Sequence, residues 1–388
     1  MNIKMGVAKA GIKPSGDYDI LVLKFPPSVY SAVFTKNSLA AAPVIYDRLV
    51  CSLQDKISAI VVNSGNANAG TGQQGYENTE KMARITAESL GISKEEVLVF
   101  STGVIGVQLP MDKVKNGIET ASSSLQELDL ELAARAISTT DAFYKYYETN
   151  GLIEDKVFTV KGIAKGAGMI HPNMATMLAY IFTDVKIDKP TLDQITKLVV
   201  DRTFNSISVD GCESTNDSFV IVATGESDVE INDSNKLYFA KKVYEVALEL
   251  AKMIVKDGEG ATKLIEINVH QAFSKDEARK ISESIALSNL FKTAMFGNDP
   301  NWGRILAAVG QTHIGIDFSQ VKLYLGDFLL YSGQPLEFDK KQASEYLKNN
   351  KEIRIDLYLG RGEEEWTYYT CDLGYKYVEI NAEYTTWR

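Results

Sequence analysis

The sequence predicts an α/β protein in which layered mixed β-sheets are sandwiched by helices. Apolar runs of strand length alternate with amphipathic helical stretches along the 388 residues, but without a regular βαβ rhythm. The last part of the chain adds short strands separated by Gly and Asp turns. A doubly wound parallel sheet is therefore disfavoured, and the length predicts two or three domain-sized lobes.

The first half of the chain contains both kinds of element. We expect strands over residues 57–62, 96–100 and 157–160, and helices over residues 76–90 and 125–137. Gly91 ends the first helix, because glycine readily adopts the conformation found at helix C-termini. The second strand runs directly into Ser101-Thr102-Gly103, which taken alone predicts a turn that ends the strand.

The second half continues this mixture. Residues 177–182 form an apolar run of strand length, and Asp188 followed by Pro190 opens a helix toward Arg202. Residues 321–388 predict a mixed or antiparallel sheet. Residues 235–255 carry the clearest helical stripe, and we expect its apolar face in the core: Leu237, Ala240, Tyr244, Ala247, Leu248, Ala251 and Ile254.

The composition excludes several classes of protein. Lys and Arg number 41 against 51 Asp and Glu, a net charge of −10, and no basic patch with interleaved aromatic residues is present. Such an acidic chain repels a phosphate backbone, so nucleic-acid binding is disfavoured. No apolar run reaches the ~18 residues of a membrane span, and residues 1–19 lack the apolar core of an export signal. We therefore expect a cytoplasmic protein without nucleic-acid or membrane partners.

No motif indicates a metal ion or an organic cofactor. The chain has three cysteines and three histidines, all widely spaced, which fits neither a disulfide framework nor a zinc site. Residues 6–14 lack the lysine and hydroxyl of a phosphate-binding loop, and no G-x-G-x-x-G opens a helix after a strand. We therefore expect reduced thiols, no bound metal and no resident cofactor.

The most unusual stretch is residues 161–184, KGIAKGAGMIHPNMATMLAYIFTD. Its glycines and proline are compatible with backbone strain, and Thr176 presents a lone hydroxyl at the start of an apolar strand. His171 has no acidic partner nearby, so a His-assisted nucleophile is not indicated. Cleavage of the Ala175–Thr176 bond would instead give Thr176 a free α-amine, with a pKa of about 7.7–8.0, that can act as its base. The alternative is a strand-edge threonine beside a glycine-rich turn.

This stretch resembles the autoprocessing signature of the ornithine acetyltransferase family, the glutamate N-acetyltransferases of arginine biosynthesis. Further segments match the family in register: VVNSGNANA (61–69), STGVIG (101–106), STTD (138–141), DG with STND (210–217), DGEGATK (257–263), FGNDPNWGR (296–304) and INAEYTT (380–386). The resemblance spans essentially the whole chain, which is identified as a member of this family. It implies the layered α/β fold that ornithine acetyltransferases share with DmpA-like enzymes.

The resemblance also implies two chains and an active site. Cleavage at Ala175–Thr176 gives an α chain, residues 1–175, that holds the oxyanion hole and a substrate-binding loop. The β chain, residues 176–388, begins with the Thr176 nucleophile, and its C-terminus closes the active site. Thr102, through its hydroxyl, and Gly103, through its backbone N–H, match the oxyanion pair.

The same resemblance implies a set of substrate-binding residues. They are Thr139 or Thr140, between which the sequence does not decide, with Lys165, Thr176, Glu259, Asn381 and Thr386. Lys165 is suited to holding an α-carboxylate as a point charge. Glu259 is suited to meeting the ornithine side-chain ammonium or the Thr176 amine.

The implied reaction is acetyl transfer from N2-acetylornithine to glutamate by a ping-pong route through acetyl-Thr176. Because many family members also accept acetyl-CoA, we expect it to serve as a second donor here, although no sequence motif bears on this. The two chains are expected to remain together in an α2β2 assembly. One alternative is an N-terminal-nucleophile amidohydrolase or aminopeptidase, in which water replaces glutamate. Another is a non-catalytic amino-acid-binding protein whose chain stays intact.

Overall fold

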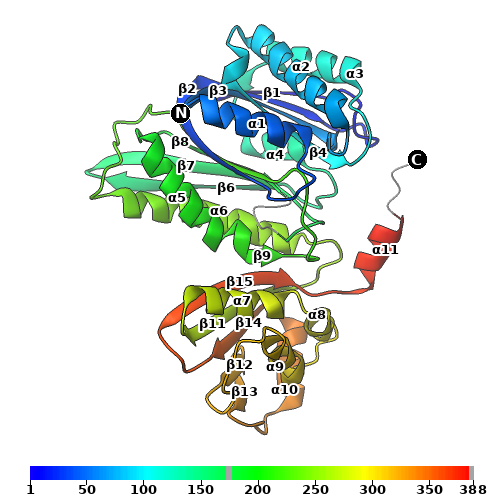
Figure 1. Cartoon of the computed structure of the whole chain (residues 1–388), viewed down its shortest axis with the longest axis vertical. Coiled ribbons are helices and arrows are strands. Elements are labelled where there is room, and N and C mark those ends of the chain that lie inside the picture. The colour runs from blue at the N-terminus through cyan, green and yellow to red at the C-terminus, as the bar shows by residue number, and fades with distance from the viewer. Residues whose placement is uncertain (172–176, 384–388) are drawn as a thin grey trace. The chain divides into compact units, whose positions relative to one another are not determined.

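The structure of the protein is a computed structural model that describes residues 1–171 and 177–383. It divides into two compact units (Figure 1). Unit 1 comprises Met1–Asn205 and Cys212–Ile254, and unit 2 comprises Ser206–Gly211 and Val255–Arg388. The short segment Ser206–Gly211 therefore joins unit 2 although it lies within the sequence of unit 1. None of the helices in the described ranges is long and apolar enough to span a membrane.

A mixed sheet forms the centre of unit 1. In the described residues its strands are β1 (Lys4–Ala8), β2 (Ile20–Phe34), β3 (Lys56–Asn66), β4 (Val97–Val104), β5 (Gln126–Glu127), β6 (Lys145–Ile153), β7 (Lys156–Lys165), β8 (Leu178–Thr183) and β10 (Ser218–Ala223). They follow the order β4-β3-β2-β10-β8-β7-β6, with β1 paired to β2 and to β5. The pairs β3–β4 and β8–β10 are parallel, and the other pairs are antiparallel.

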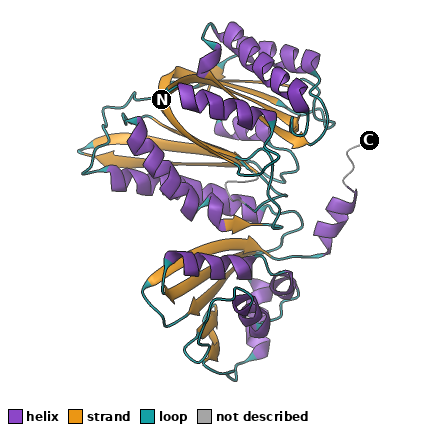
Figure 2. Ribbon diagram, viewed as in Figure 1, coloured by secondary structure: helices purple, strands orange, loops and turns teal. Residues whose placement is uncertain are grey.

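Helices cover both faces of this sheet (Figure 2). They are α1 (Ala42–Leu53), α2 (Gly72–Leu90), α3 (Met111–Ser123), α4 (Leu130–Ile137), α5 (Lys189–Arg202) and α6 (Lys236–Lys256). Successive side chains of a strand point to opposite faces. On β7, Ile163 joins the core with Ile137 of α4, whereas Phe158 packs against Phe239 of α6 with ring centroids 5.8 Å apart. This layering confirms the predicted fold class.

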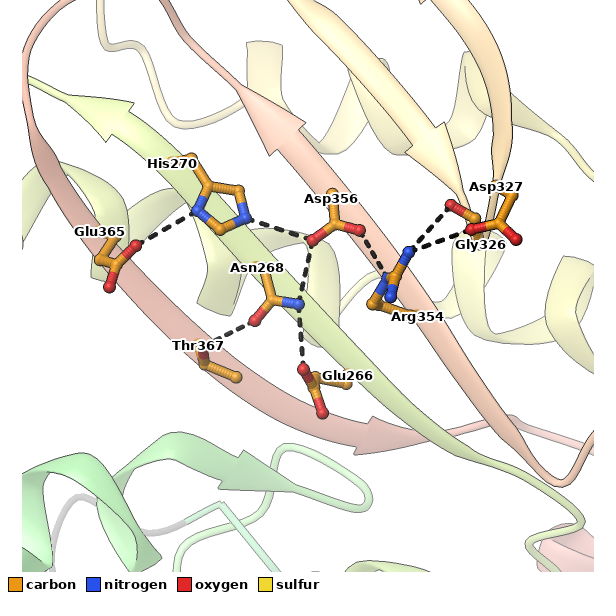
Figure 3. Close-up of polar contacts among 9 residues, drawn as sticks. All are labelled: Glu266, Asn268, His270, Gly326, Asp327, Arg354, Asp356, Glu365 and Thr367. Carbon is orange, nitrogen blue, oxygen red and sulfur yellow. Dashed lines mark hydrogen bonds and ion pairs between the residues drawn. The ribbon is translucent and has the colours of Figure 1, made fainter.

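Unit 2 contains a second mixed sheet, of order β13-β12-β14-β11-β15-β9 in the described residues. Its elements are β9 (Ile207–Ser208), β11 (Leu264–Ala272), α7 (Lys275–Ala286), α8 (Asn289–Phe296), α9 (Trp302–Gly310), β12 (Lys322–Leu325), β13 (Phe328–Ser332), α10 (Lys340–Asn349), β14 (Glu352–Tyr358), β15 (Glu364–Cys371) and α11 (Tyr375–Glu383). Ile267 and Ile355 face the apolar core with α7. The opposite face is polar, and His270 lies there between Asp356 and Glu365 (Figure 3).

Most predicted elements are confirmed, and three expectations are wrong. Ser101-Thr102-Gly103 is not a turn that ends the strand, because these residues belong to β4 and pair with the end of β3. Residues 125–137 do not form one helix, because β5 occupies part of them and α4 begins only at Leu130, after the N-cap Asp129. Leu237 is not in the core but 74% exposed, since it lies in the first turn of α6. The predicted chain boundary at Ala175–Thr176 falls between β7 and β8 of one sheet, so the predicted chains do not coincide with the compact units. The cleavage itself stays a prediction.

Candidate active site

The predicted oxyanion pair lies where two parallel strands end. Thr102 and Gly103 are near the end of β4 and pair with the end of β3. A buried network fixes this region: Ser101 Oγ donates to Asn63 Oδ1 at 2.6 Å, and Asn63 Nδ2 donates to the Asn66 carbonyl at 2.9 Å. Buried polar groups that are satisfied in this way rigidify the backbone around them.

Gly103 adopts a conformation that other residues rarely reach. Its φ is 135°, and a Cβ at this position would lie 2.2 Å from the carbonyl carbon of Gly65. A side chain is therefore excluded. Gly103 is partly accessible, whereas Thr102 is buried.

Lys165, at the end of β7, contacts Thr102. Its Nζ donates a hydrogen bond to Thr102 Oγ1 at 3.1 Å, and both side chains are buried. Because the ammonium uses a lone pair of the hydroxyl oxygen, the hydroxyl hydrogen of Thr102 stays available as a donor. A donor that is polarised in this way is suited to stabilising developing negative charge.

Asp141 organises the loop beside Lys165. Its carboxylate accepts hydrogen bonds from Lys145 Nζ at 2.6 Å, from the Gly166 N–H at 2.8 Å and from the Thr139 N–H at 2.9 Å. Burial opposes ionisation, but the ammonium groups of Lys145 and Lys165 and the hydrogen bonds outweigh it and lower the pKa of Asp141 to about 2. The ionised carboxylate therefore ties the Thr139 backbone to the end of the strand that carries Lys165.

A cavity of about 440 Å³ opens beside this loop. Its lining includes the cationic residues Lys9, Lys13 and Arg135 together with Thr139 and Asp141. Burial lowers the pKa of Lys13 to about 8, against the opposing effect of nearby carboxylates. Asp17 also lines the cavity, and its carboxylate pairs with Arg135 at 2.9 Å, so the lining is polar and carries charges of both signs.

Two other predicted binding residues meet in unit 2. Asn381 Nδ2, on α11, donates to Glu259 Oε2 at 2.9 Å and to the Tyr377 carbonyl at 3.0 Å. Gly260, next to Glu259, has a φ of 74°, and a Cβ there would lie 2.6 Å from the Tyr377 nitrogen. The turn that holds Glu259 thus packs closely against α11. The predicted residues Ala175, Thr176 and Thr386 lie outside the described residues.

The structure therefore brings the predicted residues into two groups. Unit 1 holds Thr102, Gly103, Thr139, Thr140 and Lys165, and unit 2 holds Glu259 and Asn381. Asp141 received no role from the sequence, because it lies outside any helix, where a lysine four residues later carries no signal of contact. In the described part of the chain, no cluster of three or more His, Cys, Asp or Glu is placed to hold a metal ion.

Comparisons with known proteins identify the family. The family model described as the ArgJ family matches residues 4–386. The arginine biosynthesis bifunctional protein ArgJ of Aquifex aeolicus is 50% identical over 386 residues, which cover 99% of each chain, and that of Caldanaerobacter subterraneus is 47% identical, covering 97% of this chain and 95% of the relative. The crystal structure of ArgJ from Bacillus halodurans matches with a TM-score of 0.52 at 36% identity, covering 54% of this chain and 100% of the solved chain. These matches confirm the resemblance seen in the sequence, and the chain belongs to the ArgJ family.

Proposed function

We propose that the protein is an acyltransferase of arginine biosynthesis that moves the acetyl group of N2-acetylornithine to glutamate, giving ornithine and N-acetylglutamate. Relatives that are 41–50% identical over nearly the whole chain bear the name of the bifunctional arginine biosynthesis protein ArgJ. The groups gathered around Lys165 are suited to acyl-transfer chemistry.

The hydrogen bond from Lys165 to Thr102 is the observation that carries this proposal. In acyl transfer, negative charge develops on the carbonyl oxygen of the acetamide, and preorganised donors stabilise it. The Thr102 hydroxyl, oriented by the ammonium, and the accessible backbone of Gly103 beside it are two such donors. Each typically contributes about 10²–10³ in rate.

Thr176 supplies the nucleophile in this mechanism. Its α-amine, freed by cleavage, takes the hydroxyl proton while the oxygen attacks the acetamide carbonyl. The amine then returns the proton to the departing ornithine, and the acetyl-Thr176 ester acetylates the α-amine of glutamate. The solved ArgJ structure supports a two-chain form. Its whole polypeptide matches 54% of this protein, and the predicted β chain, residues 176–388, is likewise slightly more than half of the 388 residues.

Cationic groups are suited to the carboxylates of both substrates. Lys165 takes the α-carboxylate, and Lys13 and Arg135 line the adjacent cavity. We assign the substrate-contacting role to Thr139, because it lines this cavity and Thr140 does not. In unit 2, Glu259 has the charge to meet the ornithine ammonium or the Thr176 amine, with Asn381 and Thr386 as further substrate contacts.

Three further features belong to the proposal. Acetyl-CoA serves as a second acetyl donor for glutamate. No resident cofactor is needed, because nucleophile, base and oxyanion donors are all groups of the protein. The α and β chains remain together as an α2β2 assembly in the cytoplasm.

The decisive experiment compares the wild type with Thr176→Ala on a denaturing gel and in a transfer assay. The wild type should give bands of about 19 and about 23 kDa, in proportion to the lengths of the two chains within 42.8 kDa, and the larger should begin Thr176-Met177-Leu178. Thr176→Ala should stay intact and inactive. Acetate release that exceeds N-acetylglutamate formation with glutamate present would favour the amidohydrolase, and an intact wild-type chain would favour the non-catalytic binding protein.

A further inference from the structure

The loop of residues 9–19, which joins β1 to β2 in unit 1, folds around one buried carboxylate. This carboxylate belongs to Asp19, whose side chain is 0% exposed. Its Oδ1 accepts a hydrogen bond from the Ala10 N–H at 2.6 Å. Its Oδ2 accepts hydrogen bonds from the Ile12 N–H at 2.6 Å and from the Lys13 N–H at 3.2 Å. Hairpin loops commonly have about two to five residues, so a loop of this length depends on such internal hydrogen bonds to keep one shape.

Asp19 also fixes where this loop lies against β3. Its backbone carbonyl accepts a hydrogen bond from the Ser64 N–H at 2.9 Å. The next residue on β3 is Gly65, and a Cβ there would lie 3.2 Å from the carbonyl carbon of Ile12 and 3.2 Å from Lys13 Cγ. The loop residues whose N–H groups bond to Asp19 are therefore packed on the backbone of Gly65.

Gly65 in turn lies against Gly103, the predicted backbone donor of the oxyanion hole. The two glycines are paired where β3 and β4 end, and a Cβ on Gly103 would lie 2.4 Å from the Asn66 nitrogen. The register of the two strands shifts at Asn66, which locally disrupts the hydrogen bonds between them. Strand pairing therefore holds Gly103 less firmly than a regular ladder would, and the loop packed on Gly65 supplies a second support.

We propose that Asp19 is a positioning residue for the oxyanion hole: its buried carboxylate gives the loop the shape that packs against Gly65, and this contact holds the backbone of Gly103 in place. The inference rests on the proposed function, because that function makes Gly103 an oxyanion donor. Such a donor stabilises the transition state only if it is held in advance at the place where the oxyanion forms. A displacement of about 1 Å can lower a rate by a factor of about 10².

The first test is steady-state kinetics of Asp19→Asn. Asparagine keeps the size of the side chain, but its NH2 group cannot accept a hydrogen bond from the backbone N–H that faces it. We expect kcat and kcat/KM for N2-acetylornithine to fall by the same factor of about 10–100, because the oxyanion forms only in the transition state. The matched control is Asp47→Asn, which alters another carboxylate that is 0% exposed and accepts a hydrogen bond from a backbone N–H of β4, that of Val99. It should leave kcat within about twofold of the wild type.

A second variant changes the contact with Gly65 and leaves Asp19 in place. Ile12→Ala removes Cγ2, which lies 3.2 Å from the position that a Cβ of Gly65 would take. We expect kcat to fall by a factor of about 3–10. The combination of Ile12→Ala with Asp19→Asn should lower kcat little further than Asp19→Asn alone, since both substitutions weaken the same contact.

Amide hydrogen exchange tests the positioning without any activity. The Ala67 N–H donates to the Val104 carbonyl at 2.9 Å, so its exchange reports whether the ends of β3 and β4 stay together. We expect this exchange to be about tenfold faster in Asp19→Asn than in the wild type, and unchanged in Asp47→Asn.

The inference is overturned by a kcat of Asp19→Asn within about twofold of the wild type, by full additivity of the two substitutions, or by equal exchange of the Ala67 N–H in Asp19→Asn and the wild type. If Asp19→Asn does not fold, Ile12→Ala decides, and an unchanged kcat overturns the inference. A wild-type enzyme that transfers no acetyl group to glutamate contradicts the proposed function alone, because the exchange comparison still measures whether Asp19 orders the ends of β3 and β4.

Discussion

The buried ion pair between Asp141 and Lys145 predicts a large loss of stability on Asp141→Asn. Both side chains are 0% exposed, and the charged atoms are 2.6 Å apart. Asparagine keeps the size of the side chain, but the N–H groups of Thr139 and Gly166 donate to different carboxylate oxygens and asparagine has only one acceptor oxygen, so one of these hydrogen bonds is lost. The substitution also leaves the Lys145 ammonium buried without this counter-ion. Removal of one partner of a buried pair costs about 3–5 kcal/mol.

The lowered pKa of Asp141 gives a second magnitude for the stability that Asp141→Asn removes. A shift from 3.8 to about 2 corresponds to about 2.4 kcal/mol of stability at neutral pH. Because the pKa is lowered in the folded state, this contribution is complete above about pH 4 and is lost as the pH falls through about 2, with about half left at pH 3. We therefore expect a loss of about 2.4–5 kcal/mol at pH 7 and a clearly smaller loss at pH 3.

The assay is urea unfolding followed by circular dichroism, in the Thr176→Ala background so that one chain unfolds. The matched control is Asp193→Asn. Its pair with Lys189 has the same spacing in the sequence and a distance of 3.2 Å, but the side chains are 22% and 38% exposed, so we expect a loss below about 0.5 kcal/mol. Equal losses for the two variants, or a loss for Asp141→Asn that stays constant between pH 7 and pH 3, would refute the reasoning.

Three further predictions concern other groups. Thr102→Ala should lower kcat by a factor of about 10²–10³, while Thr102→Ser should keep most of the rate. If steady-state kinetics give a kcat for Thr102→Ala within twofold of the wild type, Thr102 has a structural role only. Lys165→Met should raise KM for N2-acetylornithine by about 10–100-fold, because it removes the partner of the substrate carboxylate. It should also lower kcat, because it removes the hydrogen-bond donor to Thr102. An unchanged KM in steady-state kinetics contradicts the role of Lys165 in substrate binding. The hydrogen bonds of His270 to Asp356 and Glu365 raise its pKa against the effect of burial. These contacts therefore stabilise the folded protein fully at pH values below the pKa of histidine in the unfolded chain, and the stabilisation is lost as the pH rises through the pKa of His270 in the folded protein. His270→Gln should therefore destabilise the protein more at pH 5.5 than at pH 8.5, and urea unfolding that gives equal losses at the two values contradicts this.

The ends of several helices could be predicted because their signals are local. Gly91 has a φ of 67° at the end of α2, and the Asp188 side chain accepts a hydrogen bond from the Thr191 N–H at the start of α5. The error over residues 125–137 has the opposite origin. Apolar residues continue the helical spacing before Asp129, but pairing of β5 with β1 takes that segment into the sheet, and this is a contact that periodicity does not reveal.

The residues of the site were predictable through the family resemblance, whereas their contacts were not. Lys165 and Thr102 lie 63 positions apart on strands that are not neighbours in the sheet, so their hydrogen bond depends on the strand order. Asp217 belonged to a matched segment without a role. Its burial appears only once β10 is placed alongside β8.

Asp141 and Asp217 act on Lys165 in different ways, and the difference follows from their partners. Asp141 has a lysine and two backbone N–H groups, so it is ionised whether or not the chain is cut. Asp217 is 1% exposed and has no lysine within hydrogen-bonding distance among the described residues, so burial raises its pKa well above the usual value while the more distant Lys165 ammonium lowers it. Lys165 therefore acts on one carboxylate that is held ionised and on another whose ionisation burial opposes. Because the charge of Asp141 is paired with the Lys145 ammonium and burial favours the neutral form of Asp217, Lys165 keeps its attraction for a substrate carboxylate and the protein avoids the desolvation penalty of an unpaired buried charge.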